Sequence, residues 1–391
     1  MIKPQFRADH VGSLQRPLQL LEEIHRTYER GHTAKLAEER EKDLSRLTAL
    51  EDETIREVIA RQEEVGLDVV TDGEFRRLMY FNSFFDAVEG VAPSENKLLF
   101  QDDNGSVVEH EGPVAIVGRL RKTDSPAARE AAFARKLTDK AIKITFPTAS
   151  FLVAQVALGP TMDLGAYETI EEAATNLVKI LRELVDEAIL AGATYIQFDI
   201  SGYMMLAASP LADTLMSRGI DLDKLLKMML DADRQVVNGL PAHVTTCMHQ
   251  CRGNYASRYI TKHDHLNELS EAFFTLPYDR FTLEWDDHVT RTADDYAALE
   301  RIPKGGPTVV MGVVSTRHTQ IENADDIVRK VEKASLHVPI EQIAISPQCG
   351  FSSALGTGGE GQPDGNMISQ KTQWEKLRLL VTTADRIWGS S

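Results

Sequence analysis

The chain has 391 residues, of which 42% are hydrophobic and 26% charged, and its formal net charge is −16 at pH 7. This composition is that of a folded globular protein with a large core, and the negative charge argues against nucleic acid or an anionic membrane surface as the main partner. No stretch reaches the length of a membrane span, and residues 1–9 lack the apolar segment of a signal peptide, so we expect a cytoplasmic protein. Three cysteines are too few for a disulfide scaffold, which makes them candidates for metal ligands or nucleophiles.

Two strands near the N-terminus are each expected to end in polar residues that could bind a small molecule. Phe6–Val11 is followed by Gly12-Ser13, a turn whose amide groups could receive a carboxylate. Leu67–Thr71 ends in Asp72-Gly73-Glu74, where a carboxylate usually stays solvated or caps the chain but could also bind an ammonium group. Two helices are predicted between these strands, over about residues 16–30 and 34–65.

Residues 82–134 interrupt this alternation of strands and helices. They contain Pro93, the turn sequence Asp102-Asp103-Asn104-Gly105 and an alternating run from Val107 to Leu120, which together indicate a β-hairpin excursion. We interpret the segment as an insertion that could serve oligomer contacts or form one wall of an active site.

From residue 141 onward, strands and helices alternate regularly. One helix begins after Thr169, whose spacing from Glu172 is that of a capping box, and ends at Gly192. Two more helices are predicted, at about 222–239 and 369–388. The remaining strands are expected at Ala141–Phe146, Thr194–Phe198, Val244–Met248, Phe281–Trp285, Thr308–Val314 and Gln342–Ser346.

Eight strand-like runs that alternate with helices predict an α/β protein with a parallel sheet. Their number favours a single closed (β/α)8 TIM barrel over residues 1–391, with the β-hairpin insertion at 82–134. No Gly-x-Gly-x-x-Gly follows the first strand, which weakens the alternative of an open dinucleotide-binding sheet. Active sites of such barrels lie at the C-terminal ends of the strands. The candidate site residues fall at these ends: Ser13, Glu74, Asp199, His249, Cys251, Glu284 and Cys349.

The segment His249-Gln250-Cys251 has the spacing of a metal-binding pair. Side chains at i and i+2 leave a strand on the same side, so the imidazole and the thiolate can face one point in space. Glu284 and Cys349 end two other strands, and a set of two thiolates, one imidazole and one carboxylate is one that zinc accepts. A cysteine on a strand is, taken alone, more often a small buried hydrophobic residue, and this is our interpretation of Cys247.

Several of these segments resemble the C-terminal catalytic half of cobalamin-independent methionine synthase, and most closely the short single-barrel members of that family. The resemblance spans nearly the whole chain. It implies a TIM barrel that uses Zn2+ to transfer a methyl group to the thiol of homocysteine, giving methionine. The segments that carry it are Phe6–Pro17 (FRADHVGSLQRP), Asp72-Gly73-Glu74, His249–Asn254 (HQCRGN), Leu283-Glu284 and Ser346–Phe351 (SPQCGF).

The resemblance also implies roles for individual residues. It makes His249, Cys251, Glu284 and Cys349 the zinc ligands, and we expect Glu284 to weaken its bond to zinc as the substrate sulfur enters. A zinc-bound thiol is deprotonated, so the metal would both generate the nucleophile and orient it. Ser13, Glu74 and Asp199 match positions that hold the amino-acid end of homocysteine, with the carboxylates taking its ammonium group and the Gly12-Ser13 turn its carboxylate.

The chain departs from the full-length enzyme of that family where the methyl donor would bind. Asp199 is followed by Ile200-Ser201-Gly202 instead of an acidic residue and proline, and no tryptophan near Pro147 could hold a folate ring. At the position of that enzyme's catalytic histidine this chain has Arg317, and the adjacent His318 is the catalytic candidate. The separate N-terminal half has no counterpart, so the donor could be 5-methyltetrahydrofolate, a simpler methyl compound or a methyl-carrying protein.

Other functions remain open from the sequence. Related zinc barrels add a thiol such as coenzyme M to an epoxide, and although a sulfonate thiol has no amino group for the two carboxylates, Arg7, Arg76 and Arg252 keep this alternative open. A metal-free decarboxylase-like barrel and a binding module with a structural zinc are two further alternatives. The expected partners are a small-molecule thiol and a methyl donor, without nucleic acid or membrane, and the number of subunits, including a homo-oligomer, is left open.

Overall fold

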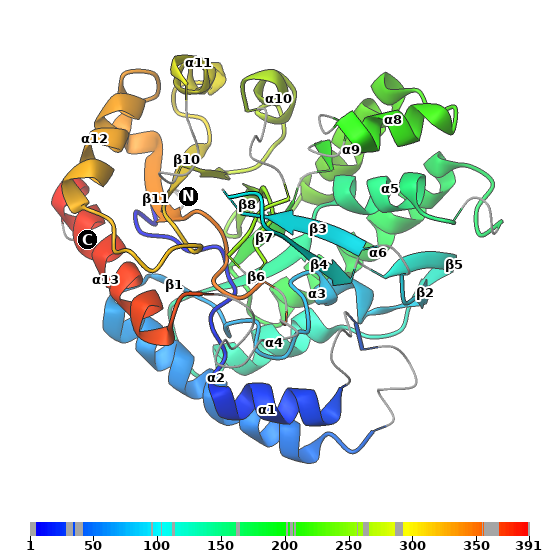
Figure 1. Cartoon of the computed structure of the whole chain (residues 1–391), viewed down its shortest axis with the longest axis horizontal. Coiled ribbons are helices and arrows are strands. Elements are labelled where there is room, and N and C mark those ends of the chain that lie inside the picture. The colour runs from blue at the N-terminus through cyan, green and yellow to red at the C-terminus, as the bar shows by residue number, and fades with distance from the viewer. Residues whose placement is uncertain are drawn as a thin grey trace.

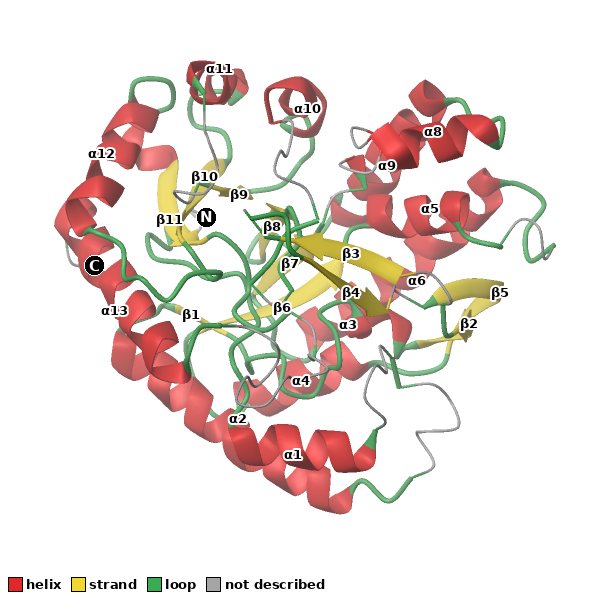
Figure 2. Cartoon of the chain, in the orientation of Figure 1, coloured by secondary structure: helices red, strands yellow, loops and turns green. Residues whose placement is uncertain are grey.

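The computed structural model is built around one parallel sheet of seven strands, with helices on its outside (Figures 1 and 2). The strand order is β1-β6-β7-β8-β9-β10-β11, so that each strand is added beside the one before it. The structure describes residues 5–28, 34–35, 42–94, 97–102, 104–111, 114–161, 165–200, 202–203, 206, 209–255, 257–260, 266–285, 292–353, 355 and 367–389.

The seven strands confirm seven of the eight predicted ones and the α/β barrel class. Nearly all of their residues are buried. Strands that are covered on both faces form continuous apolar runs in the sequence, which is why these strands could be predicted from it. The strands are β1 (Val69–Val70), β6 (Ala141–Pro147), β7 (Tyr195–Asp199), β8 (Thr245–Gln250), β9 (Arg280–Glu284), β10 (Thr308–Val314) and β11 (Ile343–Pro347).

The predicted first strand, Phe6–Val11, is reduced to a single β-bridge between Ala8 and Ile345 of β11. The amide of Asp9 donates to the carbonyl of Ile345 at 2.9 Å, and the amide of Ile345 donates to the carbonyl of Arg7 at 2.9 Å. The segment therefore lies in the position of an eighth strand beside β11. A longer backbone ladder is absent from the described residues at this position.

Buried side chains hold this N-terminal segment inside the barrel in place of backbone pairing. The ammonium group of Lys143 on β6 donates to Asp9 Oδ1 at 2.6 Å, and the hydroxyl of Tyr195 on β7 donates to Asp9 Oδ2 at 2.7 Å. Although burial raises the pKa of Asp9, the charges of Lys143 and Arg280 lower it to about 2. Because removing one partner of a buried ion pair is strongly destabilising, these contacts fix where the chain enters the barrel.

The helices follow the predicted pattern and pack an apolar face toward the sheet. Helix α6 begins after Thr169, whose hydroxyl accepts a hydrogen bond from the amide of Glu172 at 3.1 Å. The helix predicted at 34–65 begins at Ser45 in the structure, and residues 36–41 lie outside the described ranges. No described helix combines the length and apolar character needed to cross a bilayer. The helices are α1 (Leu18–Thr27), α2 (Ser45–Val65), α3 (Asn82–Phe85), α4 (Pro126–Arg135), α5 (Ala149–Leu158), α6 (Ile170–Leu190), α8 (Ser209–Ser217), α9 (Leu222–Val237), α10 (Leu266–Phe273), α11 (Ala293–Ala297), α12 (Ala324–Ser335) and α13 (Gln370–Trp388).

The predicted hairpin excursion consists of two antiparallel strand pairs. β2 (Val88–Ala92) pairs with β5 (Ala115–Lys122), and β3 (Lys97–Gln101) pairs with β4 (Val107–Glu111). The amide of Gln101 donates to the carbonyl of Tyr259 at 2.8 Å, and the carbonyl of Gln101 accepts a hydrogen bond from the amide of Tyr259 at 3.0 Å. The insertion therefore reaches the loop that follows β8.

Candidate active site

Three of the four predicted metal ligands lie together at the C-terminal ends of β8 and β11. One ligand atom from each of His249, Cys251 and Cys349 lies within 4.8 Å of the other two, and all three side chains are buried. The sulfur atoms of Cys251 and Cys349 are 3.3 Å apart. The i and i+2 spacing at the end of β8 and the parallel sheet account for this convergence.

The chemistry of this group fits a zinc ion. His249 Nδ1 lies 3.3 Å from the carbonyl oxygen of Thr282, while its buried Nε2 has no hydrogen-bond partner among the described residues. A metal-binding histidine is usually oriented in this way, with one ring nitrogen on a carbonyl and the other on the metal. Hydrogen bonding with Cys251 lowers the pKa of the Cys349 thiol, which favours the thiolate that a metal binds.

Glu284, the fourth predicted ligand, lies outside this three-residue group. Its Oε1 accepts a hydrogen bond from the amide of Arg252 at 2.6 Å, and its Oε2 accepts one from Arg317 Nη2 at 3.0 Å. Although burial raises the pKa of Glu284, the charges of Arg252 and Arg317 lower it to about 2. The structure therefore places Glu284 as an anion between two arginines, next to the loop that carries Cys251.

The loop after β10 carries Arg317 and His318, the two residues near the position of the predicted catalytic histidine. Arg317 is buried and donates to the carbonyl of Gly253 at 2.9 Å as well as to Glu284. His318 is half-buried and lies outside the three-residue metal group. The sequence analysis did not predict that the two arginines pair with Glu284; the position of Arg252 directly after Cys251 is the only sequence signal for it.

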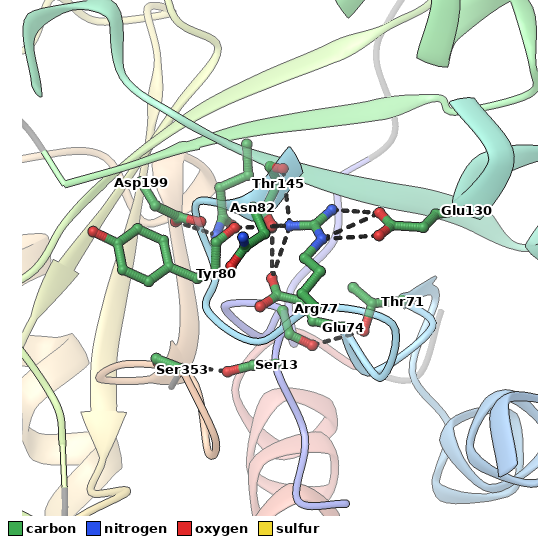
Figure 3. A network of polar contacts seen from close by, with 12 residues as sticks. Ser13, Thr71, Glu74, Arg77, Tyr80, Asn82, Glu130, Thr145, Asp199 and Ser353 are labelled. Atoms are coloured by element: carbon green, nitrogen blue, oxygen red, sulfur yellow. Dashed lines mark hydrogen bonds and ion pairs between the residues drawn. The ribbon is translucent and has the colours of Figure 1, made fainter. Parts of the chain in front are cut away.

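The two predicted ammonium-binding carboxylates, Glu74 and Asp199, lie in one polar network (Figure 3). The hydroxyl of Thr145 donates to Glu74 Oε1 at 2.6 Å, and Arg77 Nη1 lies 3.7 Å from the same oxygen. Arg77 itself is directed mainly at Glu130, with Nη2 at 2.6 Å from Oε2. Asp199 ends β7, and its Oδ1 accepts a hydrogen bond from Gln197 Nε2 at 2.8 Å.

Both carboxyl groups are buried, and of the two only Glu74 has an arginine within salt-bridge distance among the described residues. Burial raises the pKa of Glu74, and it raises that of Asp199 to about 7, with the charge of His249 opposing the shift and that of Glu74 adding to it. Asp199 has no salt bridge with a lysine or arginine among the described residues. A cation placed beside these carboxylates would compensate their buried charge, so the arrangement is suited to an ammonium group.

Ser13 connects the N-terminal turn to the loop that carries Cys349. Its carbonyl accepts a hydrogen bond from the amide of Phe351 at 2.9 Å, and its hydroxyl accepts one from the amide of Ser352 at 3.2 Å. A Cβ added at Gly350 would come within 2.1 Å of Ser13 Oγ, so any other residue at position 350 would force Ser13 to shift. The predicted carboxylate-binding turn and the metal group are therefore packed against each other.

Two residues without the freedom of glycine have positive φ at this site. Glu74 has φ 59° and Ile200, which follows Asp199, has φ 56°. For a β-branched residue this conformation is a true outlier and costs about 1–3 kcal/mol. The amide of Ile200 donates to the carbonyl of His249 at 3.1 Å and the hydroxyl of Thr148 donates to the carbonyl of Ile200, so both sides of the residue are held.

Tyr80 is a further residue of this region that the sequence analysis did not predict. Burial raises its pKa well above the ordinary value, and the negative charges of Cys251, Asp199, Cys349 and Glu74 add to the shift. Its amide donates to the carbonyl of Ser353 at 2.9 Å. Figure 3 shows its ring in the same part of the site as Asp199. The phenol therefore lies within electrostatic range of both the metal group and the carboxylates.

Comparisons with known proteins agree with this architecture. The family model described as the catalytic domain of cobalamin-independent synthase matches residues 26–358. The chain is 27% identical to the uncharacterized protein YxjH of Bacillus subtilis, over 99% of this chain and 96% of that protein. It is 25% identical to the 5-methyltetrahydropteroyltriglutamate–homocysteine methyltransferase of Yersinia enterocolitica, over 77% of this chain but 35% of that enzyme.

Two solved structures resemble the whole chain. A putative vitamin-B12 independent methionine synthase from Listeria monocytogenes superposes with a TM-score of 0.69 and 25% identity, covering 100% of both chains. A B12-independent methionine synthase from a Shewanella species, solved in complex with selenomethionine, has a TM-score of 0.65 and 21% identity, covering 98% of this chain and 97% of that one. The fold is therefore shared over the full length.

Proposed function

Because the chain belongs to the family of the cobalamin-independent methionine synthase catalytic domain, a family of methyltransferases, we propose that it transfers a methyl group to the thiol of homocysteine, giving methionine. The observation that carries the proposal is the buried group of His249, Cys251 and Cys349, with one ligand atom of each within 4.8 Å of the others. The chain spans only about a third of the length of the curated homocysteine methyltransferase cited above, so the complete reaction is part of the proposal.

In this proposal His249, Cys251 and Cys349 hold a zinc ion. The bound ion would lower the pKa of an incoming thiol so that the thiolate is available at neutral pH. The protein contributes the position of that thiolate and the exclusion of water, since all three side chains are buried. We propose that Glu284, which ends the neighbouring strand β9, is the fourth ligand of this ion, and that His318, which lies outside the three-residue group, is a catalytic residue.

The amino-acid end of homocysteine would be held on the other side of the site. Glu74 and Asp199 would bind the ammonium group, because burial raises the pKa of both carboxyls and Asp199 has no salt bridge with a lysine or arginine among the described residues. The Gly12-Ser13 turn would receive the carboxylate through its amide and hydroxyl groups. Thr145 and Arg77 would orient Glu74 through the contacts that they already make with it.

The alternative substrate, a sulfonate thiol such as coenzyme M, finds less support. It would need an arginine directed at the substrate, and each of the three candidates has an internal partner. Arg7 donates to the carbonyl of Ile343 at 2.7 Å, Arg76 pairs with Glu51 at 3.0 Å, and Arg252 pairs with Glu284 at 2.7 Å. The buried carboxylate of Asp199 would also be left without a cation.

The experiment that tests the proposal measures metal content first and thiol binding second. We expect about one zinc per chain, and proton release on adding homocysteine but not on adding coenzyme M. The methyl donor would then be identified by offering methylated folates, simple methylated sulfur compounds and methylated corrinoid proteins to the loaded enzyme. Absence of zinc, or equal proton release with both thiols, would overturn the proposed acceptor reaction.

A further inference from the structure

Tyr80 presents to the candidate site a phenol that the protein itself does not use. Within the described part of the chain its hydrogen bonds are made by the backbone, and the hydroxyl has no hydrogen-bond partner there. The side chain is half-buried. Figure 3 shows the ring in the same part of the site as Asp199, with the hydroxyl on the side away from Arg77. The phenol can therefore form a hydrogen bond with a bound molecule.

The backbone of Tyr80 is held on both sides. Its amide donates to the carbonyl of Ser353 at 2.9 Å, and its carbonyl accepts a hydrogen bond from Arg77 Nη1 at 3.0 Å. The ring packs edge-on against that of Phe81, with the two centroids 4.9 Å apart. Because Ser353 lies on the loop that carries Cys349, the phenol is fixed relative to a metal ligand before any substrate binds.

The phenol lies in negatively charged surroundings, closest to the metal group. Burial raises the pKa of Tyr80 well above its ordinary value, and of the nearby charges that of Cys251 adds most to the shift, ahead of that of Asp199. Smaller contributions come from Cys349 and Glu74. Since all four groups are buried, a larger contribution indicates a shorter distance. The phenol is thus a neutral hydrogen-bond donor on the metal side of the site.

Homocysteine, bound as proposed above, would offer the phenol one suitable acceptor. Its ammonium group has only donors, and its carboxylate is assigned to the Gly12-Ser13 turn. The thiolate at the metal group is the remaining acceptor, and it lies on the side of the site where the hydroxyl is placed. A hydrogen bond to an ionised group is about twice as strong as one between neutral groups.

We propose that Tyr80 is a further substrate-binding residue, whose hydroxyl donates a hydrogen bond to the sulfur of the bound thiol. This inference rests on the proposed function. The hydrogen bond stabilises the thiolate and fixes its direction, as partners of metal-bound groups commonly do. Because every thiol substrate carries the sulfur, the contact serves thiols with and without an amino group, in contrast to the contacts of Glu74 and Asp199.

Tyr80→Phe removes only the hydroxyl, and Tyr167→Phe is its matched control. Tyr167 is also buried, but its hydroxyl accepts hydrogen bonds from the amide of Leu120 at 2.8 Å and from Asn176 Nδ2 at 3.0 Å. Titration calorimetry on the zinc-loaded proteins would measure the affinity for homocysteine and for 4-mercaptobutyrate, which lacks the amino group. We expect Tyr80→Phe to weaken both roughly tenfold, as loss of a hydrogen bond to a charged group does, and Tyr167→Phe to change neither.

Two further readouts separate a contact with the sulfur from a structural role. Because the phenol has no partner among the described residues, Tyr80→Phe should keep the zinc affinity and the free energy of unfolding of the wild type, whereas Tyr167→Phe should be less stable. In the cobalt-substituted protein, thiol binding adds a sulfur-to-metal charge-transfer band. We expect this band at longer wavelength in Tyr80→Phe, because a thiolate without a hydrogen bond donates its electrons more readily.

The outcomes distinguish this inference from the proposed function. A wild-type protein that binds no zinc, or whose zinc binds no thiol, would overturn both. If the wild type binds thiols at the metal while Tyr80→Phe keeps both affinities and the position of the band, the role of Tyr80 alone is overturned. A loss confined to homocysteine would place the hydroxyl at the amino-acid end of the substrate and would also overturn it, as would a loss of zinc affinity in Tyr80→Phe.

Discussion

The metal half and the carboxylate half of the candidate site differ in how complete they are without a ligand. In the metal half, which comprises His249, Cys251, Cys349 and Glu284, the carboxylate of Glu284 accepts hydrogen bonds from two arginines, and one ligand atom of each of the other three residues lies within 4.8 Å of the other two. In the carboxylate half, burial raises the pKa of Asp199 to about 7, and no lysine or arginine of the described residues forms a salt bridge with it. The metal half is therefore assembled without a ligand, whereas Asp199 in the carboxylate half lacks a lysine or arginine partner among the described residues.

This difference indicates where substrate selectivity resides. A thiol brings the same sulfur to the metal half whether or not it carries an amino group. The carboxylate half gains only from a substrate with a cation, since an unpaired buried carboxylate is costly. A site whose buried polar groups are left unpaired by the wrong substrate rejects that substrate strongly. Variants in each half can test whether substrate selectivity resides in the carboxylates.

The largest effect is expected from the metal half. Cys349→Ala should lower zinc affinity by more than about 100-fold and abolish methyl transfer, because loss of a ligand exceeds the 10–100-fold effect typical of outer-shell changes. Cys247→Ala is the matched control, since Cys247 is equally buried but its sulfur lies 3.3 Å from the hydroxyl of Thr282. Zinc loss in both variants, measured by chelator competition, would contradict the assignment.

A smaller effect that depends on the substrate is expected from the carboxylate half. Asp199→Asn should lower kcat/KM for homocysteine by roughly 30-fold or more, since removing one partner of a buried charge pair costs about 2–5 kcal/mol. Zinc affinity and the activity with the des-amino thiol 4-mercaptobutyrate should stay unchanged. Asp233→Asn is the control, because Asp233 is also buried with a raised pKa but accepts a hydrogen bond from the hydroxyl of Tyr203. Equal losses with both thiols would refute the ammonium-binding role.

The pH dependence of binding should come from the same carboxyl. Because its pKa is raised to about 7, Asp199 takes up a proton as the pH falls from 7 to 6, and homocysteine affinity should drop roughly fivefold. The stability of the free protein should change in the opposite direction. A folded-state pKa above the unfolded value means that this group destabilises the fold progressively as pH rises from about 4 to 7.

Titration calorimetry between pH 6 and pH 8 would measure the binding trend, and chemical denaturation between pH 4 and pH 8 the stability trend. Asp199→Asn should flatten the binding profile, and 4-mercaptobutyrate should show no such profile with the wild-type protein. A pH profile for homocysteine that is identical in Asp199→Asn would assign the titration to another group.

The smallest effect concerns the backbone between the two halves. Ile200 has φ 56°, a conformation that glycine adopts without strain. Ile200→Gly should therefore be more stable than Ile200→Ala by about 1 kcal/mol, which reverses the ordinary order of the two residues. The free energy of unfolding of both variants, from denaturant titration, would decide the question. An alanine variant that is at least as stable as the glycine variant would show that Ile200 carries no such strain.

Local patterns in the sequence determined much of the fold and the metal half. Buried parallel strands leave continuous apolar runs, so all seven strands of the sheet were among the eight predicted, and the hairpin insertion was predicted from its turn residues and its alternation. The spacing of His249 and Cys251 directed both side chains to one point, and strand ends of a barrel share one face. These features depend on residues close together in the chain, or on rules that hold for every such barrel.

Only the tertiary structure decided how the charged groups are paired. Three such contacts join residues from distant segments of the chain. They are the pairing of Arg317 with Glu284, the contact of Ser13 with the loop after Cys349, and the ion pair between Asp9 and Lys143. Which carboxylate meets which cation follows from the curvature of the sheet and from side-chain conformations, and neither leaves a periodic signal in the sequence. For this reason the sequence identified Glu284 as a candidate ligand but not its pairing with Arg252 and Arg317.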